Sequence, residues 1–216
     1  MFNSMNTSIL RKKFPYTFYN MTLILIGINV VLFFLSSSNS KIIYYGSLIP
    51  IFIIEKHYYW QFLTYMFFHS NITHLLFNML GLFFFGSQVE KRIGSWEFLL
   101  FYLVTGLLAG VFSFAVYVWT GNYVVILLGA SGAVFAVLLA FAVFFPFARI
   151  FVFGIIPIQA PLLVVIYTVI EVFSQVSGQN SNVAHLTHLA GFGFAYLYIL
   201  IRMGINPIEV WKRTRR

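Results

Sequence analysis

The chain has 216 residues, of which 61% are hydrophobic and only 8% are charged. About a quarter of the residues in an ordinary soluble domain are charged, and a soluble fold of this size cannot hide so much apolar surface. The composition therefore excludes a soluble protein and indicates several membrane spans, with no room for a separate soluble domain. The absence of cysteine excludes disulfides and thiol nucleophiles.

Aspartate is also absent, and the five acidic residues are all glutamates. This excludes a Ser-His-Asp triad and a paired-aspartate protease. The acidic residues are Glu55, Glu90, Glu97, Glu171 and Glu209.

Six apolar segments follow a basic N-terminal stretch, and we predict an all-α membrane protein with six transmembrane helices. The fifth segment is interrupted by Pro157 and Pro161. We divide the chain into a cytoplasmic N-terminal segment (1–18), a six-span domain (19–203) and a basic cytoplasmic tail (204–216). The segments cover roughly residues 19–35, 71–86, 98–119, a fourth ending near 145, 150–173 and 183–203.

Basic residues fall almost entirely on one side of this arrangement. If the N-terminus is inside, only Lys41 and Lys56 of the thirteen basic residues lie outside. This asymmetry follows the positive-inside rule and predicts that both termini are cytoplasmic. The basic patches would then face anionic lipid headgroups, and the net charge of +8 does not indicate a nucleic-acid partner. The inner basic residues are Arg11, Lys12, Lys13, Lys91, Arg92, Arg149, Arg202, Lys212, Arg213, Arg215 and Arg216.

The link between the first two segments is long and rich in aromatic residues. It is too apolar for a solvated loop, and its rings suit the membrane interface. We predict a partly helical hairpin in the outer leaflet, which serves either as a lipid anchor or as a wall beside an active site. The residues alone favour the anchor.

Polar residues inside membrane spans are candidates for function, and the second segment contains three near its start. His74 and Asn78 are four residues apart and share one helix face. His69 lies at the predicted outer mouth, with Ser70 or Asn71 as the helix N-cap. The alternative is that these groups bond to other helices and fix the packing.

The fourth segment places a serine at the start of a short helix. From Ser131 to Phe145 a helix would measure about 22 Å, which is less than the hydrocarbon thickness of about 30 Å. The backbone before Ser131 must then be non-helical at membrane depth, which is tolerated only inside protein or beside a water-filled cavity. Between Gly129 and Gly132, Ser131 is a candidate nucleophile, although a close helix crossing at Gly132 and Ala136 explains the small residues equally well.

The sixth segment carries His188, Gly191 and Ala195 on one face, a stripe that permits close helix contact. If it contacts the fourth segment, His188 can reach Ser131 and act as its base. Without aspartate we expect a Ser-His dyad, with the ring held by packing on Phe135. The alternative role for His188 is interhelical packing.

Together these residues resemble the rhomboid family of intramembrane serine proteases. The resemblance covers roughly residues 42–201 and rests on three motifs in the expected order, with a fourth match at the turn after the second span. The motifs are His69-x4-His74-x3-Asn78, Gly129-Ala-Ser131-Gly132 and His188-x2-Gly191, and the turn is Gln88-Val-Glu90-Lys-Arg92-Ile-Gly94.

The resemblance implies a compact bundle of six transmembrane helices with a membrane-embedded outer loop between the first two. It implies Ser131 as the nucleophile and His188 as the general base and later acid. By the same match His74, Asn78 and the backbone N–H of Ser131 form the oxyanion hole, and Gly129 shapes the contact with the substrate strand.

Two positions depart from the family pattern. Phe135 stands where an aromatic residue with a hydroxyl is usual, so stacking is retained but a hydrogen bond is not. Ala195 stands where a second glycine is common, which slightly loosens the predicted helix contact.

The implied activity is endopeptidase cleavage of single-span membrane proteins in the outer part of their helix. The substrate helix must unwind there, and small residues would ease that step. Water would enter from outside through a polar mouth, to which His185 is also assigned. The mouth residues are Ser70, Asn71, Gln179, Asn180, Ser181 and Asn182.

No cofactor or metal is expected, because the chain has no His-Glu-x-x-His motif and we expect its histidines to lack a nearby carboxylate partner. We find no removed signal peptide or targeting extension, which favours a prokaryotic plasma membrane. Two other functions remain open, a catalytically inactive relative that binds membrane clients and a small transporter that uses the histidines. The transporter lacks a clear acidic partner, Glu171 being the nearest.

Overall fold

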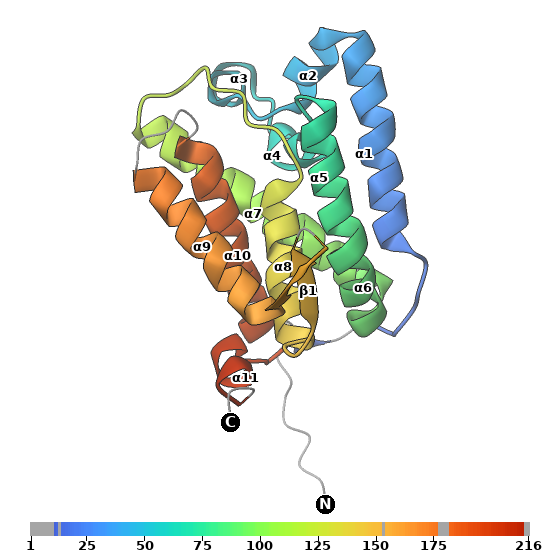
Figure 1. Cartoon of the computed structure of the whole chain (residues 1–216). Helices are drawn as coiled ribbons and strands as arrows, with labels where there is room; N and C mark the ends of the chain where they lie inside the picture. The colour runs from blue at the N-terminus through green and yellow to red at the C-terminus, as the bar shows by residue number, and fades with distance from the viewer. Residues whose placement is uncertain (1–10, 13, 153, 177–181, 214–216) are drawn as a thin grey trace, which may run out of the picture.

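The computed structural model describes residues 11–12, 14–152, 154–176 and 182–213. Helices make up most of this part of the chain, with one small β-hairpin near the lower end of the bundle (Figure 1). The elements are α1 (Met21–Ser38), α2 (Ser40–Gly46), α3 (Pro50–Lys56), α4 (Gln61–Thr64), η2 (Tyr65–Phe67), α5 (Ile72–Gly81), η3 (Leu82–Gly86), α6 (Ser87–Ile93), α7 (Ser95–Trp119), α8 (Ser131–Phe144), β1 (Arg149–Val152), β2 (Ile156–Gln159), α9 (Ala160–Val176), α10 (Asn182–Ile201) and α11 (Pro207–Arg213).

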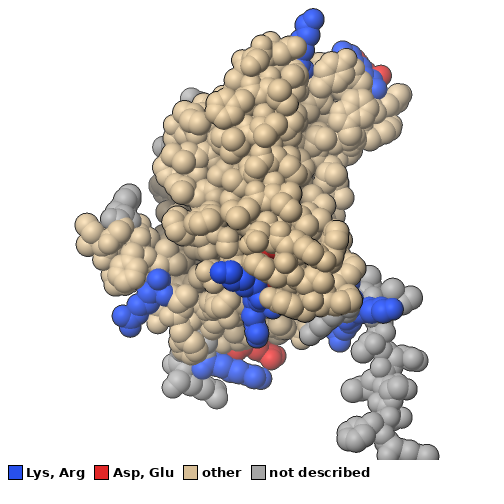
Figure 2. All heavy atoms as spheres, turned by 90° about the vertical axis from the view of Figure 1, so that its right-hand side faces the viewer, with Lys and Arg blue, Asp and Glu red and all other residues tan. Residues whose placement is uncertain are grey.

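Within the described residues, three helices are long and apolar enough to cross a membrane: Met21–Ser38, Ile72–Ile93 and Ser95–Trp119. The second consists of α5, the π-helical turn η3 and α6. Three shorter apolar helices follow, over residues 131–144, 160–175 and 185–201. Figure 2 shows Lys and Arg gathered toward the lower end and a wide, almost uncharged band above them, as a bilayer core requires.

Helix α8 forms the centre of the bundle, with α5 on one side and α10 on the other (Figure 1). Eleven of its residues, from Gly132 to Val143, are buried. A helix that is apolar on every side has no face for water or charge, so it is stable only when other helices surround it. The prediction that this helix begins at Ser131 is confirmed, and it ends at Phe144, one residue earlier than predicted.

The outer link supports the non-helical segment that leads into α8. Leu48 and Leu127 exchange two backbone hydrogen bonds of 2.9 Å, and the N–H of Ile51 donates to Tyr123 O. The N–H of Gly129 donates to Tyr65 O at 3.1 Å. These bonds satisfy backbone groups that would otherwise be unpaired at this depth. The link is therefore part of the scaffold before Ser131, and not only an anchor.

The fifth apolar segment, predicted as a span over residues 150–173 that is interrupted by Pro157 and Pro161, begins as a hairpin instead of a helix. Residues 149–159 form the antiparallel hairpin β1–β2, and helix α9 starts only at Ala160. Pro157 lies in β2 and Pro161 is the second residue of α9. Proline removes a backbone donor and is tolerated in a helix only in the first turn, so the helix begins at Ala160, where Pro161 falls in its first turn.

Glu90 fixes the N-terminal end of α1. Its side chain is almost fully buried and accepts hydrogen bonds from the backbone N–H groups of Met21 and Thr22 at 2.6 and 2.8 Å. The hydroxyls of Thr22 and Ser95 donate to the same carboxylate. Two unpaired N–H groups at the start of α1 are thus capped from another helix, where their dipole favours a negative charge.

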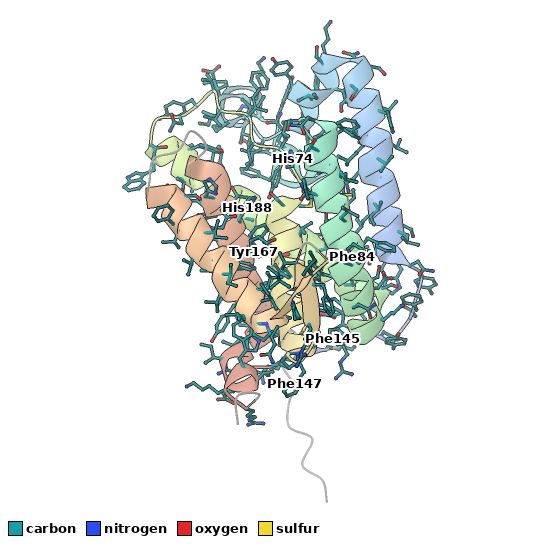
Figure 3. The ribbon with its side chains drawn as sticks, in the orientation of Figure 1. His74, Phe84, Phe145, Phe147, Tyr167 and His188 are labelled. Carbon is teal, nitrogen blue, oxygen red and sulfur yellow. The ribbon has the colours of Figure 1, made fainter. Side chains whose placement is uncertain are left out.

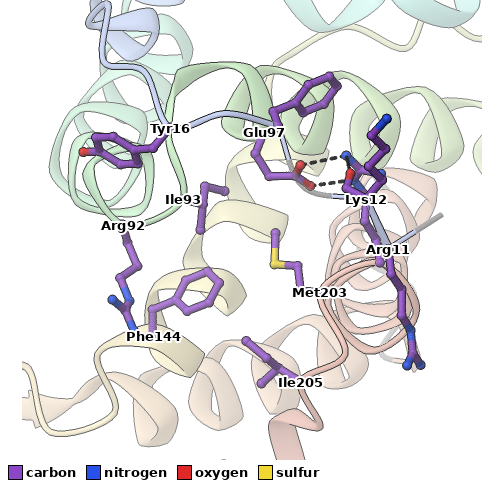
Figure 4. A pocket seen from close by; sticks show the side chains of 11 residues that line it. Arg11, Lys12, Tyr16, Arg92, Ile93, Glu97, Phe144, Met203 and Ile205 are labelled. Atoms are coloured by element: carbon purple, nitrogen blue, oxygen red, sulfur yellow. Dashed lines mark hydrogen bonds and ion pairs between the residues drawn. The ribbon is translucent and has the colours of Figure 1, made fainter. Parts of the chain in front are cut away.

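A second carboxylate, Glu97, joins α7 to the end of α10. Arg202 donates to both of its oxygens at 2.6 and 2.8 Å, and the Tyr198 hydroxyl donates at 2.7 Å. Glu97 and Arg202 border a cavity of about 310 Å³ at the end of the bundle where α10 ends (Figure 4). The cavity is lined by Arg11, Lys12, Phe14, Tyr16, Arg92, Ile93, Glu97, Phe144, Arg202, Met203 and Ile205.

Candidate active site

Ser131 and His188 lie in direct contact. The serine is the first residue of α8, and the histidine projects from α10 toward the centre of the bundle (Figure 3). His188 Nε2 is 2.7 Å from Ser131 Oγ, within hydrogen-bond distance. A hydroxyl bonded to an imidazole nitrogen is the arrangement in which histidine can remove the serine proton.

The close crossing of α8 and α10 makes this contact possible. A Cβ atom added to Gly191 would lie 2.1 Å from the backbone oxygen of Gly132. Any larger residue at position 191 would therefore push the two backbones apart. The expected approach of the sixth segment to the fourth is confirmed, and Ala195, one turn further, is fully buried at 0% exposure.

Phe135 supports the histidine ring. The two rings stack with centroids 4.3 Å apart and planes 14° apart. Tyr167 of α9 packs edge-on against Phe135 (centroids 5.7 Å apart), and the labelled Tyr167 lies below His188 in Figure 3. Stacking holds the plane of the imidazole and disfavours tilting of the ring away from Phe135.

His74 faces the serine across Gly129. A Cβ at Gly129 would lie 2.7 Å from His74 Nε2 and 3.8 Å from Ser131 Oγ. Gly129 also has a φ of +125°, a conformation that favours glycine. His74 Nδ1 is 3.1 Å from Ser70 Oγ, so the opposite nitrogen is directed toward the space above Gly129.

Asn78 lies one turn after His74 on the same face of α5. Its amide donates to the backbone oxygen of His74 at 2.9 Å, which occupies one of its two N–H groups. Asn71 is the N-cap of α5, since its side-chain oxygen accepts from the N–H of His74 at 2.8 Å. Ser70 and Asn71 are exposed at this end, whereas Gln179, Asn180 and Ser181 lie outside the described residues.

His69 is not a mouth residue. It is only 1% exposed, lies before α5 and packs edge-on against His74 with centroids 5.0 Å apart. Neither ring nitrogen has a hydrogen-bond partner among the described residues. Burial, together with the neighbouring His74, lowers the pKa of His69 from 6.5 to about 3.

This pKa predicts that the protein loses stability in mild acid. In the unfolded chain His69 takes up a proton below pH 6.5, whereas in the fold it stays neutral down to about pH 3. The free energy of unfolding therefore falls as the pH drops through this window, by about 2 kcal/mol between pH 7 and 5.

Thermal unfolding in detergent at pH 7 and pH 5 checks this prediction. His69→Leu should lose less stability than wild type on acidification, and the exposed-site variant His57→Asn should lose as much. An equal loss in His69→Leu and wild type would contradict the assignment.

Glu171 is the residue that sequence reasoning missed. Its carboxylate lies 2.9 Å from His188 Nδ1 and 2.5 Å from His185 Nδ1. The expectation that the histidines lack a carboxylate partner is therefore wrong, and His185, which was assigned to the polar mouth, bonds to Glu171. The usable signal was an acidic residue within an apolar helix, which by itself indicates function. His185 and His188 follow Glu171 by 14 and 17 positions in the sequence, so only the packing of α9 on α10 brings the three residues together.

The same three side chains are also candidate ligands for a metal ion. Glu171, His185 and His188 each offer one ligand atom, and these atoms lie within 4.8 Å of one another. Two imidazoles and a carboxylate are donor types that Zn²⁺ accepts. In this structure the Nδ1 atoms of His185 and His188 are each hydrogen-bonded to one oxygen of the Glu171 carboxylate. These bonds pair both carboxylate oxygens.

The apolar helices and the uncharged band define an integral membrane protein. The chain belongs to the rhomboid family, because the family model described as Rhomboid domain matches residues 56–204.

Curated relatives carry the same family name. The chain is 31% identical over 142 residues to Rhomboid protease AarA of Providencia stuartii, covering 57% of this chain and 50% of that protein. It is 32% identical over 123 residues to Rhomboid protease GluP of Bacillus subtilis (strain 168), covering 54% and 23%. RHOMBOID-like protein 2 of Arabidopsis thaliana is 28% identical over 165 residues, covering 76% and 48%. The match thus spans half or less of the length of each of these three relatives.

Proposed function

We propose that this protein is an intramembrane serine endopeptidase. The observation that carries the proposal is the 2.7 Å contact between Ser131 Oγ and His188 Nε2, inside an apolar helical bundle. A serine–histidine pair serves hydrolysis of acyl groups in unrelated folds. The names of the relatives, which are rhomboid proteases, support the same activity.

The proposed reaction proceeds in two steps. Ser131 Oγ attacks the substrate carbonyl carbon while its proton moves to His188 Nε2. His188 then donates that proton to the leaving amine nitrogen as the C–N bond breaks, leaving an ester on Ser131. Water attacks this ester and gives a proton to His188, which returns it to Ser131 Oγ as the carboxyl product leaves.

The oxyanion formed in each step needs hydrogen-bond donors. We assign this role to the backbone N–H of Ser131, His74 and Asn78. The position of the His74 ring across Gly129 supports the assignment, as does the second, unused N–H of the Asn78 amide. The start of α8 adds the positive end of a helix dipole.

The proposed membrane arrangement has six spans with both ends cytoplasmic. The spans are α1, the continuous helix of α5, η3 and α6, and then α7, α8, α9 and α10. Helix α8 has 14 residues and measures about 21 Å, so Ser131 would lie below the outer surface. The outer link would then be embedded beside the active site in the outer leaflet.

The substrates would be single-span membrane proteins, cut in the outer part of their helix. A helical backbone engages its carbonyls in internal hydrogen bonds, so the helix must unwind before Ser131 can attack. Residues of low helix propensity near the cut would ease this step. Exposed Ser70 and Asn71 mark the side from which water would enter.

The transporter alternative gains one supporting observation, because Glu171 supplies the acidic partner that it lacked. Transport, however, gives no role to the Ser131–His188 contact. Cleavage of a substrate distinguishes the peptidase from the transporter, because only the peptidase breaks a peptide bond.

A cleavage assay tests the proposal. The purified protein in detergent is given a fluorogenic peptide that contains one transmembrane helix. We expect cleavage by wild type and no detectable cleavage by Ser131→Ala. Ser37→Ala, which removes an exposed hydroxyl that bonds only within α1, should cleave like wild type. Cleavage that survives Ser131→Ala would refute the mechanism, and failure of wild type on every substrate would favour the client-binding relative.

A further inference from the structure

Glu171 is a buried acid in an apolar helix. Its side chain is 8% exposed and lies on α9, between hydrophobic residues on both sides in the sequence. Removing a carboxylate from water is unfavourable by several kcal/mol unless partners compensate. A carboxylate at this position therefore needs hydrogen-bond donors nearby that compensate for its lost hydration.

The compensating partners are the two histidines of α10. Glu171 Oε1 is 2.9 Å from His188 Nδ1, and Glu171 Oε2 is 2.5 Å from His185 Nδ1. The other nitrogen of His188, Nε2, is the one bonded to Ser131 Oγ at 2.7 Å. The three groups form an unbroken chain of hydrogen bonds from the carboxylate through the imidazole to the serine.

We propose that Glu171 is a positioning residue that completes a Ser131–His188–Glu171 relay, in place of a serine–histidine dyad. This inference rests on the proposed peptidase function. The packing of α9 on α10 thereby places a glutamate carboxylate beside His188, in a chain that contains no aspartate.

The first effect of Glu171 is on the tautomer of His188. An ionised carboxylate can only accept hydrogen bonds, so Nδ1 of His188 must carry the proton that it donates. Nε2 is then unprotonated and free to accept the proton of Ser131. With the opposite tautomer, Nε2 would carry a proton and could not act as a base.

The second effect is on the charge that develops during reaction. When His188 takes the serine proton it becomes an imidazolium, and the adjacent carboxylate stabilises this cation. Glu171 stays ionised throughout, and no proton is transferred to it. Phe135 holds the ring plane by stacking, whereas Glu171 sets which nitrogen faces the serine.

His185 gives the carboxylate a fixed orientation. Its bond to Oε2 leaves Oε1 directed at His188 Nδ1. Two bonds from one helix hold the carboxylate more firmly than one, which matters for a side chain with three rotatable bonds.

The test compares four proteins in the cleavage assay. Glu171→Gln keeps the size of the side chain but removes the charge, and its amide can donate to Nδ1 and favour the opposite tautomer. We expect kcat to fall by about 10²- to 10⁴-fold with little change in KM. Glu171→Asp retains the charge and should recover part of the loss. Thr168→Val, on the same helix with a hydroxyl that bonds only to Val164 O, is the matched control and should cleave like wild type.

A second measurement reads the tautomer without relying on activity. Nitrogen NMR of ¹⁵N-histidine-labelled protein should show His188 protonated at Nδ1 in wild type, and a shift toward Nε2 protonation in Glu171→Gln. A merely structural role would lower the melting temperature without moving this signal.

The outcomes separate this inference from the function on which it rests. If wild type cleaves in a Ser131-dependent way but Glu171→Gln keeps the wild-type kcat and tautomer, the relay is overturned and the peptidase stands. If no Ser131-dependent cleavage occurs, the peptidase fails, and NMR still shows whether Glu171 sets the tautomer. Loss of wild-type cleavage on addition of a chelator would also overturn the relay, because it would assign the three side chains to a metal ion.

Discussion

His188→Ala is expected to lower kcat by about 10²- to 10⁴-fold, because it removes the base 2.7 Å from Ser131 Oγ. Without that base the serine hydroxyl is a weak nucleophile. We propose that the imidazole acts in the chemical step and not in binding, so KM should change little. The rate of cleavage of a fluorogenic transmembrane peptide measures the effect.

A serine-directed fluorophosphonate gives an independent reading. Wild type should be labelled at Ser131, His188→Ala much more slowly and Ser131→Ala not at all. The control is His57→Asn, which changes an exposed histidine in the outer link and should cleave like wild type. Rapid labelling of His188→Ala would show that another group activates the serine.

Gly191→Leu is expected to abolish cleavage and destabilise the fold. Its Cβ alone would lie 2.1 Å from the backbone oxygen of Gly132, and a backbone atom cannot rotate away as a side chain can. The helices α8 and α10 must separate, which breaks the Ser131–His188 contact. Overpacking of this kind typically destabilises by about 1–3 kcal/mol, and the longer side chain adds to the strain.

Gly193→Leu is the matched control, because a Cβ there meets no atom within 4 Å and the residue is exposed. It should cleave like wild type and melt at a similar temperature. Thermal unfolding in detergent and the cleavage assay together make the comparison. A Gly191→Leu protein with normal melting and cleavage would show that α8 and α10 do not cross so closely.

Local sequence features predicted several elements well. The start of α8 at Ser131 followed from the length of the apolar run before Pro146 and from the glycines around the serine. The approach of α10 to α8 followed from the small residues Gly191 and Ala195. These predictions succeeded because helix length and small-residue spacing depend on neighbours within a few turns.

Other features depend on contacts between distant segments, and the sequence alone predicted them poorly. The hairpin β1–β2 is a local exception: Pro157 and Pro161 already interrupt the expected span in the sequence, but the pairing of residues 149–152 with 156–159 was not predicted. His69 was placed at the mouth but is buried and packs against His74 of α5. The burial of His69 leaves no periodic pattern that a single sequence reveals.

Glu171 shows most clearly which properties follow from the sequence and which require the tertiary structure. The missing aspartate, read from the sequence alone, determined that any serine nucleophile here works without an aspartate partner. The sequence also determined the membrane class and the candidates Ser131 and His188, and it predicted that the basic residues gather at one end of the bundle. Only the tertiary structure decided that α9 brings a glutamate to within 2.9 Å of His188 Nδ1. The physical reason is that a hydrogen bond between two helices depends on their relative rotation and distance, which packing of the whole bundle decides.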